Sequence, residues 1–357
     1  LEEGAAIAAG YPCCSFRGAI VALDAKSGDE IWRRHFIAAP EQNGVNAAGT
    51  PQFGPSGVPI WAGMAIDADH LYIATGDDYS GDGSETSDAI IALDKASGRT
   101  VWIRQARFGD VWNGSCENID PVNCPEDNGP DYDYGAGPVI SEDSKKRRII
   151  LAGDKGGVVT AMLAETGESL WKTKVGRGGV VAGVNFGLAA YDGKVFVPIS
   201  DVPDGREYDE PARPGVYALN VDNGEYAWQA PAGEDVCAGR PGCYPGYSAA
   251  ISVTRDFVLA GSNEGWLRAF DIDSGEVLWE FDTTQAFTAV DGRMARGGSI
   301  GGGQAPLVVG DRLVLNSGYA FAGKMPGNAL LILKLPASQA SLAQQSDAQD
   351  FMESAAK

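Results

Sequence analysis

The sequence predicts an all-β protein built as a β-propeller, and a repeated motif is the main evidence. The motif has eleven residues, with Ala first, Gly seventh and Trp eleventh, and it occurs five times at intervals of 51 to 70 residues. The copies are Ala22–Trp32, Ala92–Trp102, Ala161–Trp171, Ala218–Trp228 and Ala269–Trp279. A motif that keeps its internal spacing while the intervals vary marks one supersecondary unit with loops of different lengths. The 48 Gly and 19 Pro residues agree, since they suit a chain with many turns.

Each copy predicts a hairpin that carries a Trp on its second strand. In the first copy we expect a strand over Gly18–Asp24, a turn over Ala25–Gly28 and a returning strand over Asp29–Phe36. The Gly supplies the positive φ that closes the turn. The Trp faces the small Ala at the start of the motif, which predicts an indole docked against the neighbouring unit. Four-stranded antiparallel units that cannot bury a face alone stack radially into a propeller.

The end of the chain departs from the repeat. Gly302–Leu335 contains strand-like runs but no Trp motif, so we expect an atypical terminal blade. The last segment, Ala337–Lys357, is rich in Ala, Gln and Ser and predicts a frayed helix or a disordered tail. The expected organisation is therefore a propeller over residues 1–336 and a polar tail over 337–357. An ordinary β-sandwich with chance turns is the alternative.

Charge and cysteine content restrict partners and compartment. The formal net charge is −20, which argues against binding to nucleic acid or anionic lipid and leaves a basic protein partner open. No run approaches 18 apolar residues, so no membrane-spanning segment is expected. The six cysteines predict the pairs Cys13–Cys14, Cys116–Cys124 and Cys237–Cys243, with six reduced thiols as the alternative. Such pairs indicate an oxidising compartment, periplasmic or secreted. The chain opens on Leu1 without a signal peptide, which suggests a fragment or a processed product.

Histidine is too scarce for several kinds of catalytic site. Only His35 and His70 occur, which argues against His-rich zinc sites and a Ser-His-Asp triad. The acidic stretch Gly76–Asp88 lacks the ligand spacing of an EF-hand loop. Other oxygen-bearing side chains lie between the motifs, where propeller loops reach one face, and they would suit a hard cation such as calcium. They are Glu2, Glu3, Asp77, Asp110 and Asn113.

The motif resembles the tryptophan-docking repeat of the quinoprotein alcohol dehydrogenases. These are eight-bladed propellers that hold pyrroloquinoline quinone (PQQ) and calcium on the axis. The resemblance rests on RGAIVALDAKSG and SDAIIALDKASGRTVW. Stretches between the repeats resemble one branch, the cytochrome-linked polyvinyl alcohol dehydrogenases: LEEGAAIAAGYPCCSFRG, GTPQFGPSGVPIWAGMAID, GDVWNGSCENIDPVNCPEDNGPDYDYGAGPVI and NSGYAFAGKMPGNALL. The likeness covers Leu1 to about Leu335 and implies about six of the eight four-stranded blades, without the upstream ones.

The resemblance also implies a cofactor site. Trp61 falls where the family places a Trp that stacks on the quinone, and Lys155 matches the basic residue that hydrogen-bonds the quinone oxygens. Asp77 falls where the family has an Asn calcium ligand, and either Glu2 or Glu3 would be the carboxylate ligand. Further cofactor contacts are implied at three positions: Arg17, Asn185 and Tyr247.

Two positions depart from the family pattern. The catalytic Asp of the family aligns with Asn113, a further candidate calcium ligand, and an amide cannot take a proton. Asp110, three residues earlier, is the candidate general base, unless the alcohol loses its proton to the quinone system itself. Cys13–Cys14 is comparable with the vicinal disulfide of the family. It lies, however, in an inserted segment before Arg17 that aligns with a later blade, which suggests a different role.

The function implied by the resemblance is PQQ- and calcium-dependent oxidation of secondary alcohols, with polyvinyl alcohol as the type of substrate. Electrons would pass to cytochrome c, because the chain has no C-x-x-C-H haem attachment motif of its own. A non-catalytic scaffold resembling the outer-membrane assembly lipoprotein, which shares the repeat, is the first alternative. A quinone-free module that binds a carbohydrate or polymer is the second.

Overall fold

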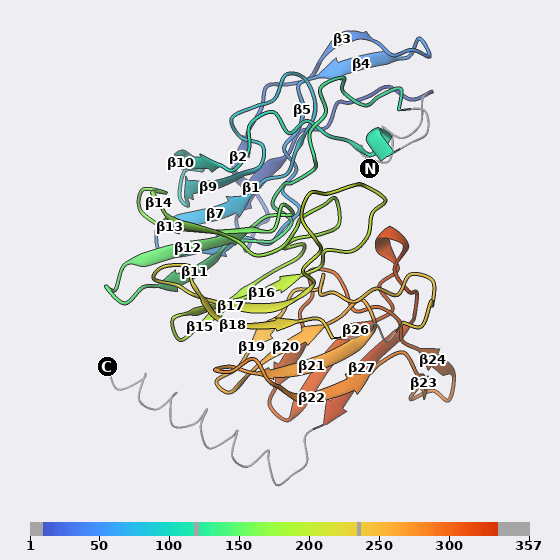
Figure 1. Ribbon diagram of the computed structural model, residues 1–357. Helices are drawn as coiled ribbons and strands as arrows, with labels where there is room; N and C mark the ends of the chain where they lie inside the picture. Colours follow the sequence, from blue (N-terminus) through green and yellow to red (C-terminus); the bar gives the residue numbers. More distant parts are fainter. Residues whose placement is uncertain (1–9, 118–120, 234–236, 335–357) are drawn as a thin grey trace.

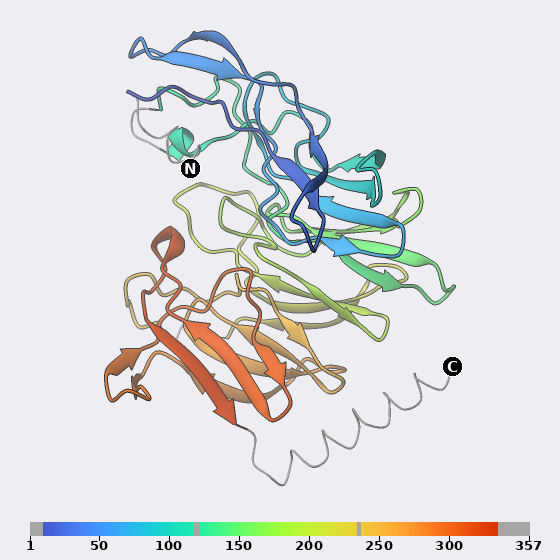
Figure 2. The same cartoon turned by 180° about the vertical axis from the view of Figure 1, so that it is seen from behind.

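The structure is a row of antiparallel sheets arranged as consecutive propeller blades. It is a computed structural model that describes residues 10–117, 121–233 and 237–334. Six sheets follow one another along the chain, and Figure 1 shows them in sequence order from blue to red. The first and last sheets lie at opposite ends of the row in both views (Figures 1 and 2). The all-β propeller class predicted from the repeats is confirmed.

Four of the six blades have four described strands. The first blade pairs β1 (Ala19–Leu23) with β2 (Glu30–His35). The second blade has the strand order β10-β9-β7-β6: β6 (Ala65–Ile66), β7 (His70–Ala74), β9 (Ala89–Asp94) and β10 (Thr100–Gln105). The third blade is β11 (Val139–Glu142), β12 (Arg148–Gly153), β13 (Val158–Leu163) and β14 (Ser169–Lys174).

The remaining blades repeat this meander. The fourth consists of β15 (Ala189–Tyr191), β16 (Lys194–Ile199), β17 (Gly215–Asn220) and β18 (Tyr226–Pro231). The fifth consists of β19 (Ser252–Val253), β20 (Phe257–Gly261), β21 (Trp266–Asp271) and β22 (Val277–Asp282). The last has three described strands: β25 (Leu307–Val309), β26 (Arg312–Ser317) and β27 (Ala329–Lys334).

Short elements lie in the connections between blades and in loops within them. Three two-stranded pairs are present: β3 (Glu41–Val45) with β4 (Pro51–Gly54), β5 (Ser56–Gly57) with β8 (Asp78–Ser80), and β23 (Ala286–Thr288) with β24 (Met294–Arg296). Two short 3-10 helices are η1 (Gly114–Glu117) and η2 (Phe321–Gly323). No helix in the described part of the chain is long and apolar enough to cross a membrane.

The repeated Trp docks each blade onto the next, as the motif predicts. In all five copies the Trp pairs across the hairpin with the Ala that begins the motif. Four of the indoles donate their Nε1–H to the carbonyl of the fourth motif residue in the following blade, at 2.7 to 3.2 Å: Trp32 to Lys95, Trp102 to Ala164, Trp171 to Val221 and Trp228 to Ile272. This contact fixes the angle between neighbouring sheets.

The motif Gly has a second role that the turn argument did not include. A Cβ on Gly224 would lie 2.4 Å from the Trp171 ring, and one on Gly275 would lie 2.5 Å from Trp228. The indole therefore packs flat against the Gly of the next repeat. Trp279 is the exception, since its side chain is 41% exposed. The expected docking fails there because the last blade carries no motif Gly.

The hydrophobic core lies in layers between neighbouring blades. Between the third and fourth blades, for example, Ile149, Leu151 and Val159 pack with Val195 and Leu219. Similar clusters join the other neighbouring blades. Because the inner blades are packed against a neighbour on both faces, they form a rigid frame for the loops at the blade ends.

The three expected disulfides are confirmed. Cys13–Cys14, Cys116–Cys124 and Cys237–Cys243 are all bonded, and no described cysteine is free. Cys13 and Cys14 are buried with Tyr79. Cys116–Cys124 closes part of the long connection between β10 and β11. The predicted tail over 337–357 and the candidates Glu2 and Glu3 lie outside the described residues.

Candidate functional site

The candidate site lies in loops that follow the second strand of consecutive blades. Asp77 follows β7 in the second blade, and Lys155 follows β12 in the third. Because the blades share one strand order, these loops reach the same face of the propeller. Trp61 comes from the connection between β5 and β6. The repeat thus brings together three predicted residues that are far apart in sequence.

Lys155 is the centre of a buried charge cluster. Its ammonium group forms ion pairs with Asp131 and with Asp133, where the Nζ–Oδ1 distance is 2.6 Å. The other oxygen of Asp133 accepts a hydrogen bond from Trp61 Nε1 at 3.1 Å. Lys155 Nζ also lies 5.9 Å from the centre of the Trp61 ring, within the range of a cation–π contact. Asp133 therefore links the indole to the lysine.

Asp77 joins this cluster through its carboxylate. One oxygen from each of Asp77, Asp131 and Asp133 lies within 4.8 Å of the other two, and all three residues are buried. Two oxygens in this group, Asp77 Oδ1 and Asp131 Oδ2, have no hydrogen-bond partner, and Asp133 Oδ1 is paired with the Lys155 ammonium. Buried carboxylate oxygens without donors are the ligands that calcium prefers.

Burial and mutual repulsion shift the proton affinities of these groups. Burial raises the pKa of Asp131 to about 7, even though the Lys155 ammonium opposes the shift. Burial, followed by repulsion from Asp133 and Asp131, raises the pKa of Asp77 well above its usual range. Burial alone would lower the pKa of Lys155, but the carboxylates of Asp131, Asp133 and Asp77 outweigh it and hold the pKa well above its usual range. Lys155 is therefore a permanent cation.

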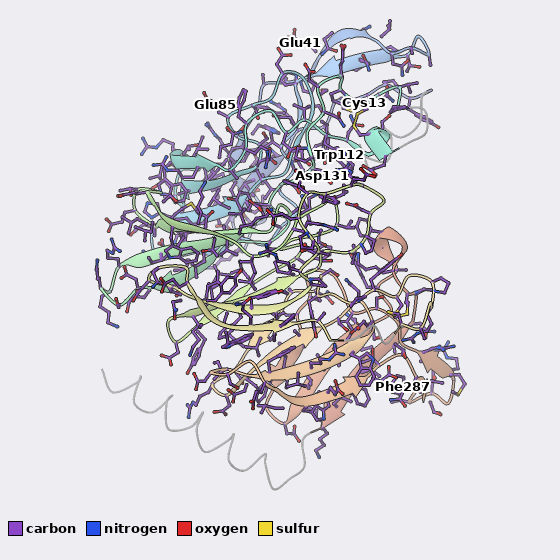
Figure 3. The ribbon with its side chains drawn as sticks, viewed as in Figure 1. Cys13, Glu41, Glu85, Trp112, Asp131 and Phe287 are labelled. Carbon is purple, nitrogen blue, oxygen red and sulfur yellow. A yellow bond between two sulfur atoms is a disulfide. The ribbon has the colours of Figure 1, made fainter. Side chains whose placement is uncertain are left out.

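Asp110 fixes the backbone that carries two of these acids. Its carboxylate oxygens accept the N–H groups of Asp131 at 3.0 Å and Tyr132 at 2.9 Å. Arg107 lies 3.8 Å from the same carboxylate. Arg206, from the fourth blade, donates to the carbonyl of Pro130 at 3.0 Å. These contacts determine where Asp131 and Asp133 meet Lys155, and Figure 3 shows Asp131 among the loops at the blade ends.

Asn113 is engaged with the backbone of the same long connection. Its Nδ2 donates to the carbonyls of Tyr79 and Asn123, both at 2.9 Å, and its Oδ1 accepts the Ser115 N–H at 2.9 Å. The amide is fully buried. These contacts make Asn113 a structural link between two loops, and its roles as a calcium ligand and near the reacting alcohol stay predictions.

The three other predicted cofactor residues lie at varying distances from the cluster. Asn185 is buried, and a Cβ on Gly135 would lie 2.3 Å from its carbonyl and 2.6 Å from the Trp61 ring. Tyr247 belongs to a separate group, since its hydroxyl accepts a hydrogen bond from Arg268 at 2.9 Å. Arg17 reaches the carbonyl of Ile37 at 3.4 Å. Among the described residues, no contact joins Tyr247 or Arg17 to Lys155.

Trp61 presents its ring to a pocket of about 340 Å³. The side chain is 44% exposed, although its Nε1 is bonded inside the cluster. The pocket walls are largely glycine and apolar side chains, including Gly63, Gly187 and Phe186. A half-exposed indole above a fixed cation and a small pocket is an arrangement that a flat aromatic cofactor requires.

Sequence reasoning missed Asp131, Asp133 and Asp88. Asp131 and Asp133 lie in the stretch PDYDYG, which belongs to no repeat. Their only sequence signal is two acids separated by one residue in a connection rich in Gly, Pro and Cys. Asp88 immediately precedes β9 and is fully buried. It ends the acidic stretch Gly76–Asp88, which sequence reasoning set aside because its ligand spacing does not fit an EF-hand loop.

The described residues suit both groups that the resemblance implies. The carboxylate oxygens of Asp77, Asp131 and Asp133 would suit calcium, since the donor set is all oxygen and three carboxylates face one ammonium group, that of Lys155. The Trp61 face, Lys155 and the glycine-lined pocket would suit PQQ.

Two family models match the chain. The family model described as "Outer membrane protein assembly factor BamB" matches residues 86–321, and the model "Glucose/ethanol/alcohol dehydrogenase, beta-propeller domain" matches residues 4–119. The first match covers more than half of the chain. The chain therefore belongs to the PQQ-repeat β-propeller family, and its N-terminal part also matches the propeller model of the glucose, ethanol and alcohol dehydrogenases.

The curated relatives narrow the resemblance to one branch. The chain is 37% identical over 325 residues to a polyvinylalcohol dehydrogenase from Pseudomonas sp, and 34% identical over 319 residues to one from Sphingopyxis sp. (strain 113P3). These matches cover 89% and 87% of the chain but 50% and 48% of the relatives. The chain thus spans about half the length of the curated relatives it matches. A solved quinohemoprotein alcohol dehydrogenase from Comamonas testosteroni shares the fold, with a TM-score of 0.59, 17% identity, and coverage of 90% of this chain and 57% of that one.

Proposed function

We propose that this chain forms the cofactor-binding propeller of a PQQ- and calcium-dependent alcohol dehydrogenase that oxidises secondary alcohols of the polyvinyl alcohol type. The observation that carries the proposal is the buried Lys155, paired with Asp131 and Asp133 beneath the half-exposed Trp61. The two polyvinylalcohol dehydrogenase relatives support the substrate class.

The residues have separable roles in this proposal. Trp61 would bind one face of the quinone and exclude water from it. Lys155 would hold the cofactor oxygens by charge. Asp77, Asp131 and Asp133 would hold calcium, with Glu2 or Glu3 as the further carboxylate predicted from the sequence. When bound, PQQ supplies a two-electron acceptor for the alcohol carbon, and calcium polarises oxygen atoms beside it.

The proton acceptor for the alcohol hydroxyl is assigned to the pair Asp131 and Asp133. Both carboxylates face Lys155, whereas both oxygens of Asp110 already accept backbone N–H groups. We therefore prefer the pair to Asp110 and give Asp110 a positioning role. A carboxylate buried beside a fixed ammonium can take up a proton without leaving its site.

The acceptor and the compartment are parts of the same proposal. Electrons would pass to a cytochrome c, which the chain's strong negative charge would attract if the cytochrome is basic. Three disulfides support a periplasmic or secreted location. The scaffold alternative is favoured by the match to the assembly-factor model over residues 86–321, and it requires neither quinone nor calcium.

The test is titration of the purified chain with PQQ and calcium, followed by quinone absorbance and by dye-linked oxidation of a secondary alcohol and of polyvinyl alcohol. We expect saturable, calcium-dependent binding with turnover. Lys155→Met should abolish binding, while the matched control Lys146→Met, at an exposed ion pair, should not. Asp131→Asn and Asp133→Asn should lower kcat, and they should also weaken quinone binding, because that binding is expected to depend on the calcium that these residues hold.

One result would contradict the enzyme and favour the scaffold. It is the absence of quinone binding both by this chain and by a longer version that includes the remaining length of the relatives. Equal binding by Lys155→Met and wild type would show that the cluster is not the cofactor site.

A further inference from the structure

A second group of buried acids lies beside the site described above. It shares Asp77 with that site and adds Asp88, to which the site assigns no role. One oxygen from each of Asp77, Asp88 and Asp110 lies within 4.8 Å of the other two. The three residues come from different segments, namely the loop after β7, the residue before β9 and the connection after β10. Asp88 and Asp110 are 0% exposed and Asp77 is 3% exposed.

Asp88 and Asp77 have carboxylate oxygens that lack the partners that buried carboxylates require, whereas both oxygens of Asp110 accept backbone N–H groups. Both oxygens of Asp88 and Oδ1 of Asp77 have no hydrogen-bond partner. Among the described residues, the one ion pair to Asp88 or Asp110 is Arg107 with Asp110 at 3.8 Å, and that arginine side chain is 48% exposed. The contrast is Asp78, equally buried, whose carboxylate accepts hydrogen bonds from the N–H and hydroxyl of Ser84.

Such a group needs positive charge or protons. A buried carboxylate without a donor is strongly disfavoured unless it is paired, protonated or bound to a metal. Lys155 already contacts Asp131 and Asp133, so it serves the neighbouring group. The charges around the second group are otherwise acidic, because Asp133 also faces Asp88 and Asp131 faces Asp77.

The donor chemistry suits calcium. Ligand oxygens lie about 2.4 Å from Ca²⁺, so two of them on opposite sides of the ion are separated by about 4.8 Å. The three oxygens lie within 4.8 Å of one another, and all three ligands are hard oxygen donors.

We propose that Asp77, Asp88 and Asp110 form a second calcium site that shares Asp77 with the group of Asp131 and Asp133. Asp110 also holds the N–H groups of Asp131 and Tyr132, so an ion here stabilises the backbone of the neighbouring acids. The site requires no quinone, and its test is therefore independent of the proposed oxidation.

The experiment is calorimetric titration of the chelator-treated 357-residue chain with CaCl₂ alone. We expect two calcium ions per chain in the wild type. Asp88→Asn should lose one equivalent or bind it at least tenfold more weakly, and Asp133→Asn should affect the other equivalent. The matched control Asp78→Asn, at a buried but hydrogen-bonded carboxylate, should retain two.

Three results would overturn the proposal. They are a single calcium in the wild type, no calcium in the folded wild type, and two unweakened calcium ions in Asp88→Asn. Circular dichroism checks that each variant is folded. If Asp88→Asn does not fold, Asp110→Asn replaces it with the same expectation, and the wild-type count stands as a test in its own right.

Discussion

Replacing one motif glycine by alanine tests whether Trp docking holds the blades together. Gly224 has φ +72°, and a Cβ there would lie 2.4 Å from Trp171 Cε3 and 2.6 Å from Cδ2. Gly28 occupies the same motif position with φ +79°, but nothing lies within 4 Å of its Cβ position, because no described Trp precedes it. Both substitutions place Ala at positive φ, so only Gly224→Ala adds a clash.

The expected magnitudes follow from these two terms. The left-handed conformation costs about 1–2 kcal/mol for Ala in either variant. Overpacking against the indole adds about 1–3 kcal/mol. Displacement of Trp171 would also lose its 2.7 Å hydrogen bond to Val221, worth about 1 kcal/mol. We therefore expect Gly224→Ala to lower the free energy of unfolding by about 2–5 kcal/mol and Gly28→Ala by about 1–2 kcal/mol.

Equilibrium urea unfolding of the two variants and wild type measures the difference. In a Trp171→Ala background the cost of Gly224→Ala should fall towards that of Gly28→Ala, because the clash with the indole is gone and only Thr173 Oγ1, at 2.7 Å, still crowds the added Cβ. Equal losses for the two single variants, or an unchanged cost in the Trp171→Ala background, would refute the docking argument and leave the glycines as turn residues only.

Two further predictions concern Lys155 and its sequence neighbour Asp154. Lys155→Met should lower the free energy of unfolding by about 3–5 kcal/mol in chelator, because it leaves Asp131 and Asp133 buried without their cation. Lys146→Met, at an exposed ion pair, should change it by less than about 1 kcal/mol. Similar losses for both variants in urea unfolding would contradict the role given to the buried ion pairs. Burial raises the pKa of Asp154 to about 7, against the hydrogen bond from the Val158 N–H. The folded carboxyl therefore keeps its proton between about pH 4 and pH 7, where the unfolded one has lost it, and the contribution to stability declines as pH rises through this window. Asp154→Asn should flatten that decline in the free energy of unfolding measured at several pH values, and an unchanged slope would show that Asp154 titrates normally.

The sequence predicted the positions of the blades much better than those of the buried aspartates. The spacing of Ala, Gly and Trp is local, and the fixed hairpin geometry converts it into a docking contact in four of five copies. Trp279 does not dock in this way, because the last blade has no motif and therefore no Gly against which the indole could pack. The positions of Trp61, Asp77 and Lys155 were found through resemblance, and the repeat places their loops on one face of the propeller.

The acids beside Lys155 could not be found in this way because their positions depend on non-local contacts in a long connection. Asp131 and Asp133 follow a loop closed by Cys116–Cys124, and their backbone is held by Asp110 and Arg206. None of these contacts has a periodic signature in the sequence. The sequence singled out Asp110 and Asn113 as candidate site residues of this connection, and each makes hydrogen bonds to backbone groups that no spacing argument predicts.

The separation between frame and loops has a chemical consequence. The blades bury apolar layers and need no metal, so they can hold several carboxylates in positions that these groups would not adopt by themselves. Five buried aspartates form two neighbouring groups that share Asp77, and Lys155 contacts two of the five, so carboxylates outnumber ammonium groups in this buried region. The stability of the packed blades keeps these carboxylates buried close together, and their uncompensated negative charge favours the binding of cations at this face of the propeller. Calcium binding should therefore raise the free energy of unfolding of wild type more than that of Asp88→Asn, since one of the two ions is expected to depend on Asp88.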